Sequence, residues 1–153
     1  MKSCAFFGHR ICPDYISTRI REILIDLIEN HCVEVFYVGK QGMFDSIVLN
    51  VLRELAQIYP HIRYYVVLER MPDKSNAYTA YKYYETILPE SIENVHPKYA
   101  ISWRNRWMIK QSDYVVTYIT HSQGGAAQFS EMAKRQNKED CSFRIGRGSD
   151  RPC

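Results

Sequence analysis

The sequence lacks several features that mark whole classes of proteins. No apolar run approaches the roughly 20 residues that cross a bilayer, so we predict no transmembrane helix and no membrane partner. The first residues lack the long apolar stretch of a secretory signal, which favours a cytoplasmic location. The net charge is only +3 and the pI about 8.6, below the value of about 9 typical of nucleic-acid-binding domains. This small charge argues against nucleic acid as the partner.

Paired cysteines are also missing. The five cysteines are an odd number and none forms a C-x-x-C pair, so we expect reduced thiols in a cytosolic protein. Zinc sites need closely spaced Cys or His ligands, and no such spacing occurs here. We therefore expect neither a metal nor a cofactor. With 46% hydrophobic and 24% charged residues and no internal repeat, the 153-residue chain has the composition of one globular domain.

Apolar runs and helical periodicities alternate along the chain. Short β-branched and aromatic runs predict four strands, at residues 4–7, 33–38, 62–68 and 114–119. Apolar residues at helical spacing predict helices at 13–30, 44–58, 99–111 and 125–137. Strands and helices that alternate in this way predict an α/β fold, a Rossmann-like doubly wound parallel sheet with helices on both faces. We expect a single domain over residues 1–138.

Two segments depart from this alternation. Residues 69–98 contain three prolines and a run of tyrosines but few aliphatic residues, which predicts an irregular excursion with at most one short helix. Residues 139–153 begin with alternating apolar side chains and end in a polar, glycine-containing stretch. We predict an edge strand or a flexible tail there.

Glycines mark the predicted strand-to-helix junctions. Five of the seven glycines follow predicted strands, namely Gly8, Gly39, Gly42, Gly124 and Gly125. Right-handed crossovers bring the carboxyl ends of parallel strands to one edge of the sheet, where open sheets bind ligands. A glycine turn before a helix lets backbone N–H groups approach a phosphate. A tight turn needs glycine whatever its function, but three junctions at one edge favour a ligand crevice.

Four motifs in the chain resemble the SLOG superfamily, the Rossmann-like group that includes the DNA-processing protein Smf/DprA and the cytokinin-activating Lonely Guy enzymes. The motifs, in chain order, are Phe7-Gly8-His9-Arg10, Gly42-Met43-Phe44-Asp45, Trp103-Arg104-Asn105-Arg106-Trp107-Met108 and Gly124-Gly125-Ala126-Ala127. Within the superfamily they are most similar to the bacterial YpsA-like family. The resemblance implies a fold that binds nucleotides or nucleotide-derived ligands, with the phosphate near the Gly-Gly loop.

The resemblance to the Lonely Guy enzymes also implies a candidate reaction. Those enzymes hydrolyse the N-glycosidic bond of nucleoside 5′-monophosphates with an Arg on a helix and a Glu after the glycine loop. Arg104 and Glu131 stand at these two positions, which makes them the candidate catalytic residues. The sequence departs from the pattern at Asn105, Ala127 and Gln128, which stand in place of Lys, Gly and Thr. Loss of the Thr hydroxyl removes a phosphate ligand, and Ala127 adds bulk where the backbone approaches the ligand. These departures weigh against catalysis more than against ligand binding.

The candidate ligand-binding residues follow from the same motifs. They are Gly8, His9, Arg10, Gly42, Asp45, Asn105, Gly124, Gly125 and Ala126. Arg10 is suited to a phosphate and Asp45 to a ribose hydroxyl, although a carboxylate at a helix start also serves the helix dipole. We therefore predict a protein that binds a nucleoside monophosphate or an ADP-ribose-type ligand. The alternatives are a phosphoribohydrolase and a single-stranded DNA-binding protein, and a homo-oligomer is compatible with each.

Overall fold

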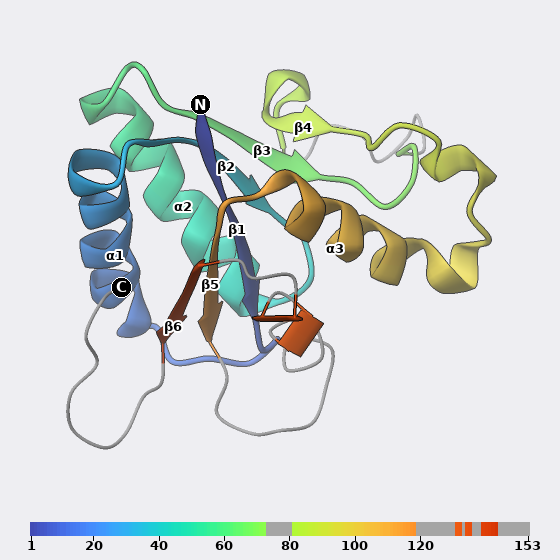
Figure 1. The fold of residues 1–153 in the computed structure, drawn as a ribbon, viewed down its shortest axis with the longest axis horizontal. Coiled ribbons are helices and arrows are strands. Elements are labelled where there is room, and N and C mark those ends of the chain that lie inside the picture. Colours follow the sequence, from blue (N-terminus) through green and yellow to red (C-terminus); the bar gives the residue numbers. More distant parts are fainter. Residues whose placement is uncertain (73–80, 119–130, 133, 136–138, 144–153) are drawn as a thin grey trace.

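In the computed structural model, six parallel strands of the described residues form one sheet, in the order β4-β3-β2-β1-β5-β6 (Figure 1). The structure describes residues 1–72, 81–118, 131–132, 134–135 and 139–143. The strands are β1 (Lys2–Gly8), β2 (Val33–Val38), β3 (Arg63–Val67), β4 (Thr86–Ile87), β5 (Tyr114–Tyr118) and β6 (Glu139–Phe143). The helices are α1 (Ile16–Asn30), α2 (Met43–Ile58) and α3 (Ala100–Gln111). This architecture confirms the predicted α/β fold and its parallel sheet.

The strand order reverses at the centre of the sheet. From β1 the chain adds β2, β3 and β4 on one side, and then returns to place β5 on the other side of β1. Cys4 is therefore paired with Phe36 of β2 on one side and with Tyr114 of β5 on the other. In doubly wound sheets the crevice at such a reversal is the usual ligand site. Here it lies beyond the carboxyl ends of β1 and β5.

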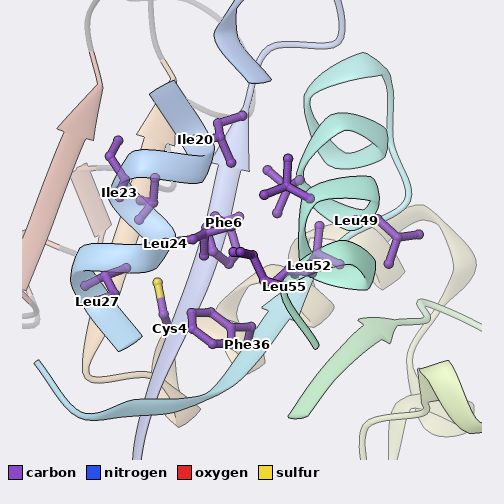
Figure 2. Close-up of a cluster of buried hydrophobic side chains, with 14 of the residues drawn as sticks. Cys4, Phe6, Ile20, Ile23, Leu24, Leu27, Phe36, Leu49, Leu52 and Leu55 are labelled. Carbon is purple, nitrogen blue, oxygen red and sulfur yellow. The ribbon is translucent and has the colours of Figure 1, made fainter. Parts of the chain in front are cut away.

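Helices α1 and α2 cover one face of the sheet, where most of the core lies (Figure 2). Their apolar residues recur at helical spacing, so each helix presents one continuous apolar face to the strands. Ile20, Leu24 and Leu27 of α1 and Leu52 and Leu55 of α2 are buried against the sheet. This packing fixes the start of α2 at the carboxyl edge of the sheet.

Helix α3 covers the opposite face, which confirms helices on both sides (Figure 1). Its Met108 and Ile109 pack on Ala5, Phe7 and other strand residues in a second, smaller core. The helix also buries Arg104 and Asn105, whose relative exposures are 2% and 8%. The face of α3 that meets the sheet is therefore partly polar.

The segment between β3 and α3 contains more regular structure than the sequence predicts. Its described residues, 68–72 and 81–99, hold three short 3₁₀ turns, at Tyr83–Glu85, Ile92–Asn94 and Pro97–Tyr99, and the two-residue strand β4. The buried Glu85 anchors it, because Arg53 of α2 donates to both carboxylate oxygens at 2.8 Å and the Tyr64 hydroxyl donates at 2.7 Å. These bonds hold the segment against α2 and β3.

The carboxyl-terminal strand β6 pairs in parallel with β5 and forms one edge of the sheet. Residues 131, 132, 134 and 135 are helical, within the predicted last helix, and Met132 packs against the second core. Residues 144–153 lie outside the described part of the chain. None of the described helices has the length and apolar content needed to cross a bilayer.

A candidate ligand site at the carboxyl edge of the sheet

Two loops meet at the carboxyl edge, one after β1 and one after β2. The Met43 N–H donates to the Arg10 carbonyl at 2.8 Å and so ties the start of α2 to the first loop. Gly42 has a φ of 95°, and a Cβ there would lie 2.5 Å from the Arg10 Cα. Both the positive φ and the close approach require glycine at this position. The contact between the two loops therefore accounts for Gly42 without a ligand.

A shallow, open hollow lies where these loops join α2. Its volume is about 420 Å³, within the range of roughly 300–1,000 Å³ typical of small-molecule sites. It is lined by Arg10, Asp14, Lys40, Gly42, Met43, Ser46 and Ile47. Two cationic side chains, Arg10 and Lys40, and one carboxylate, Asp14, thus stand at the amino end of a 16-residue helix, where the helix dipole is positive. This combination favours an anionic group such as a phosphate.

Behind the hollow lies a cluster of buried charged groups. Arg104 donates from Nε and Nη2 to Asn105 Oδ1, at 3.1 and 2.9 Å, and from Nη1 to Glu69 Oε2 at 3.5 Å. The other oxygen of Glu69 lies 3.3 Å from Nζ of Lys40. Glu69 therefore bridges the buried guanidinium of Arg104 to a lysine that lines the hollow. Since burying charges is costly, the cluster is a feature that core packing alone does not explain.

Gly39 and Asp45 complete this cluster. A Cβ at Gly39 would lie 2.9 Å from Asp45 Oδ2 and 3.1 Å from Arg104 Nη2, so the missing side chain leaves room for both groups. The Gln41 N–H donates to Asp45 Oδ2 at 2.8 Å. Burial raises the pKa of Asp45 to about 6, against the opposing effects of the Gln41 hydrogen bond and the Arg104 charge. Burial also lowers the pKa of Arg104, although an arginine keeps its proton in proteins.

An aromatic cluster occupies the carboxyl edge between β1 and β5, whereas the hollow lies beside it, where the loops after β1 and β2 meet the start of α2. The ring of Tyr118, at the end of β5, stacks on Phe44 with centroids 6.0 Å apart, and the His9 ring meets it edge-on at 6.1 Å. The His9 N–H donates to the Tyr118 carbonyl at 3.3 Å. A Cβ at Gly8 would lie 2.2 Å from the Phe44 ring. Gly8 is therefore needed for packing, whether or not a ligand also approaches it.

The structure brings most of the described candidate residues to this edge. Arg10 and Gly42 line the hollow, and Asp45, Arg104 and Asn105 lie in the buried cluster behind it. The carboxylate of Glu131, by contrast, is largely exposed, with its Oε1 3.8 Å from Nζ of Lys134. Gly124, Gly125 and Ala126 lie outside the described residues.

Sequence reasoning missed Lys40 and Glu69. Glu69 stands directly after a predicted strand and Lys40 two residues after another, at the edge where open sheets bind ligands, and position alone was the available signal. Among the described residues, no group of three or more His, Cys, Asp or Glu side chains is placed to hold a metal ion.

Comparison with known proteins identifies the fold. No protein-family profile matches the chain. No curated protein matches it either. Among solved structures, the X-ray structure of DNA processing protein A (DprA) from Streptococcus pneumoniae is similar, with a TM-score of 0.64 and 16% identity. The match covers 97% of this chain and 51% of that protein, so the chain spans about half the length of its structural neighbour. At this identity the likeness establishes a shared Rossmann-like fold.

Proposed function

We propose that this protein binds a nucleotide-derived ligand, a nucleoside monophosphate or an ADP-ribose-type molecule, with its phosphate in the hollow at the start of α2. The observation that carries the proposal is the meeting of Arg10, Lys40 and the amino end of α2 around one open volume. Each supplies positive potential, against the single carboxylate of Asp14 in the lining and that of Glu69 beside Lys40, and together they suit an anionic group. The motifs and the shared fold support membership of the SLOG superfamily, and the motifs alone favour the YpsA-like family.

Binding is better supported by the described residues than hydrolysis of the ligand. Arg104 is 2% exposed and its guanidinium is held by Asn105 and Glu69. Glu131 lies at the surface near Lys134. A phosphoribohydrolase would need these two side chains to meet at one substrate bond. We therefore assign Arg104 a positioning role, in which it holds Glu69 and, through Glu69, Lys40.

Thermal unfolding in the presence of ligands tests this proposal. The panel contains AMP, GMP, CMP, UMP, NAD and ADP-ribose at millimolar concentration, and also a short single-stranded DNA because the structural neighbour is a DNA processing protein. A ligand at 100 times its Kd adds about 2.7 kcal/mol to the free energy of unfolding. In a chain of this length that raises Tm by several degrees. Chromatography of the same samples detects any released base and so tests hydrolysis.

Variants at the hollow show where the ligand binds. Arg10→Gln and Lys40→Gln should each reduce the rise in Tm, because each removes a positive charge from the phosphate position. Arg106→Gln is the matched control, since Arg106 is exposed on α3 and does not line the hollow. A flat panel for the wild-type protein would refute the proposal. A rise for DNA alone, unaffected by Arg10→Gln, would favour nucleic-acid binding at another surface.

A further inference from the structure

A second hollow opens between α1 and α2, next to the first. Its volume is about 280 Å³, and it shares Asp14 and Ile47 with the lining of the first hollow. We call it the groove, because it runs between two helices that lie side by side on this face of the sheet (Figure 2). Its polar lining consists of Asp14, Ser17, Thr18, Arg21, Asn50 and Glu54. The hollow and the groove therefore adjoin at the residues that they share.

The helical repeat of α1 and α2 builds the groove. On α2 the lining residues Ile47, Asn50 and Glu54 recur every three or four positions, and so lie on one face of the helix. On α1, Ser17 and Arg21 are four residues apart and share a face in the same way. The face of α2 that begins at the hollow therefore continues into the groove.

The groove differs from the hollow in its charge. Arg21 and Glu54 form an ion pair in its lining, which neutralises both side chains. Among the described residues Arg21 is the only cation there, so a second phosphate would find no unpaired positive charge, and the carboxylate of Asp14 would repel it. The groove therefore suits a neutral, polar group.

The other polar side chains of the groove are available to a ligand. No hydrogen bond or ion pair to another described residue engages the side chains of Asp14, Thr18 or Asn50. They offer a carboxylate, a hydroxyl and an amide, which together can accept and donate hydrogen bonds. Two adjacent sugar hydroxyls require such a set, since each hydroxyl both donates and accepts. A carboxylate that accepts from a ribose hydroxyl is also the arrangement found in dinucleotide-binding folds.

We propose that the groove binds the ribose of the ligand by its 2′ and 3′ hydroxyls, with Asp14 and Asn50 as the main partners, while Arg10 and Lys40 hold the 5′-phosphate. This inference rests on the proposed function and narrows the ligand class to ribonucleotides and their derivatives. Only the C5′ methylene and an ester oxygen separate the ribose ring from its phosphorus atom, so phosphate and sugar need adjoining sites. A deoxyribonucleotide, and hence single-stranded DNA, lacks the 2′ hydroxyl and should bind less tightly.

Asp14 thus takes the role that the sequence suggested for Asp45. Asp45 is 7% exposed, its Oδ2 accepts the Gln41 N–H at 2.8 Å, and it lines neither the hollow nor the groove. Asp14 is exposed and belongs to both linings. Of these two carboxylates, Asp14 is the one that a ligand can contact.

Isothermal titration with two matched ligands tests the inference. AMP and 2′,3′-dideoxyadenosine 5′-monophosphate share a base and a phosphate, and differ in the two ribose hydroxyls. Loss of one hydrogen bond weakens binding by about threefold to tenfold, so the wild-type protein should prefer AMP by about tenfold or more. Arg10→Gln should weaken both ligands alike, because Arg10 acts on the phosphate that they share.

Variants in the groove should change this preference. Asn50→Ala should reduce it by about threefold or more, and leave the affinity for the dideoxy ligand within about twofold. Asp14→Ala should also reduce it, and should tighten binding of the dideoxy ligand, because a negative charge beside the phosphate is removed. Asn94→Ala is the matched control for Asn50→Ala, since Asn94 is exposed in the 3₁₀ turn at Ile92–Asn94 and lines neither cavity. The substituted residues are exposed, so the unliganded Tm of each variant should stay within a few degrees of the wild type.

The outcomes separate the two proposals. Equal affinity of the wild-type protein for AMP and the dideoxy ligand would refute the ribose site and leave the phosphate site standing. The same conclusion follows if Asn50→Ala and Asp14→Ala both keep the full preference for AMP. If neither ligand binds, the proposed function fails and the ribose site fails with it.

Discussion

The buried carboxyl of Asp45 makes the stability of this protein depend on pH. Burial raises its pKa from 3.8 to about 6. The hydrogen bond from Gln41 and the positive charge of Arg104 both lower this pKa, but by less than burial raises it. A raised pKa means that the folded protein holds the proton more tightly than the unfolded chain does. The protonated Asp45 carboxyl therefore makes its full contribution to the free energy of unfolding below pH 3.8. This contribution is lost as the pH rises through 6.

The size of the effect follows from the two pKa values. Each pKa unit corresponds to about 1.4 kcal/mol, so the change from 3.8 to about 6 is worth about 3 kcal/mol. For a chain of about 150 residues, this corresponds to a fall in Tm of roughly 6–12 °C, most of it between pH 4 and pH 7. Asn at position 45 has nearly the shape of the protonated acid, and its side-chain oxygen can still accept the Gln41 N–H. Asp45→Asn should therefore remove this fall.

Urea unfolding at half-unit steps from pH 4 to pH 7.5 measures this dependence. The free energy of unfolding of Asp45→Asn, minus that of the wild type, should increase across this range by about 2.4 kcal/mol, with its midpoint between pH 5 and 6. Glu90→Gln serves as the control, because Glu90 is exposed and its variant should follow the wild-type curve. A difference that stays constant with pH would show that Asp45 is ionised in the folded protein throughout, and that the burial argument is wrong.

Two further predictions concern residues that hold the fold. Glu85→Gln should lower the free energy of unfolding at pH 7 by roughly 2–4 kcal/mol. In this variant the Arg53 guanidinium, which donates to both oxygens of Glu85, would face a neutral amide in place of the carboxylate. The pKa of Glu85 is lowered to about 2, mainly by its hydrogen bond from Arg53, so the wild type should lose this stabilisation only as pH falls from 4.5 toward 2. Gly8→Ala should destabilise the fold by roughly 1–3 kcal/mol in chemical denaturation, because its Cβ would lie 2.2 Å from the Phe44 ring. Adding Phe44→Leu should recover part of that loss, and a strictly additive double variant would contradict the steric explanation.

The sequence predicts the fold well because the fold depends on local patterns. The strand at 33–38 has its predicted bounds, since a β-branched and aromatic run stops at Gly39. Helix α2 begins one residue before its predicted start and ends at its predicted last residue. In both cases a single local signal, apolar periodicity or a breaker residue, determines the element. Such signals are present in the chain before any tertiary contact forms.

The candidate site was less predictable because its contacts are tertiary. No local pattern pairs Lys40 with Glu69, since the two residues follow different strands and meet only when β2 and β3 align. The burial of Arg104 and Asn105 runs against the usual preference of polar side chains for water. Strand β4 has only two residues, too few for any periodicity, and the buried Glu85 that precedes it holds that segment in place.

The candidate site has a tightly packed interior and an open surface. This difference affects how much side-chain entropy each cation would lose when a ligand binds. Gly39, Asp45, Glu69 and Arg104 are packed together, so their positions are set by the fold before a ligand arrives. Lys40 is tied to that interior through Glu69, whereas Arg10 is exposed. A cation already held in position loses little side-chain entropy when it meets a phosphate, but a free one must be ordered. Under the proposed function, Lys40 should therefore contribute through its fixed geometry, and the buried charges would serve to hold it there.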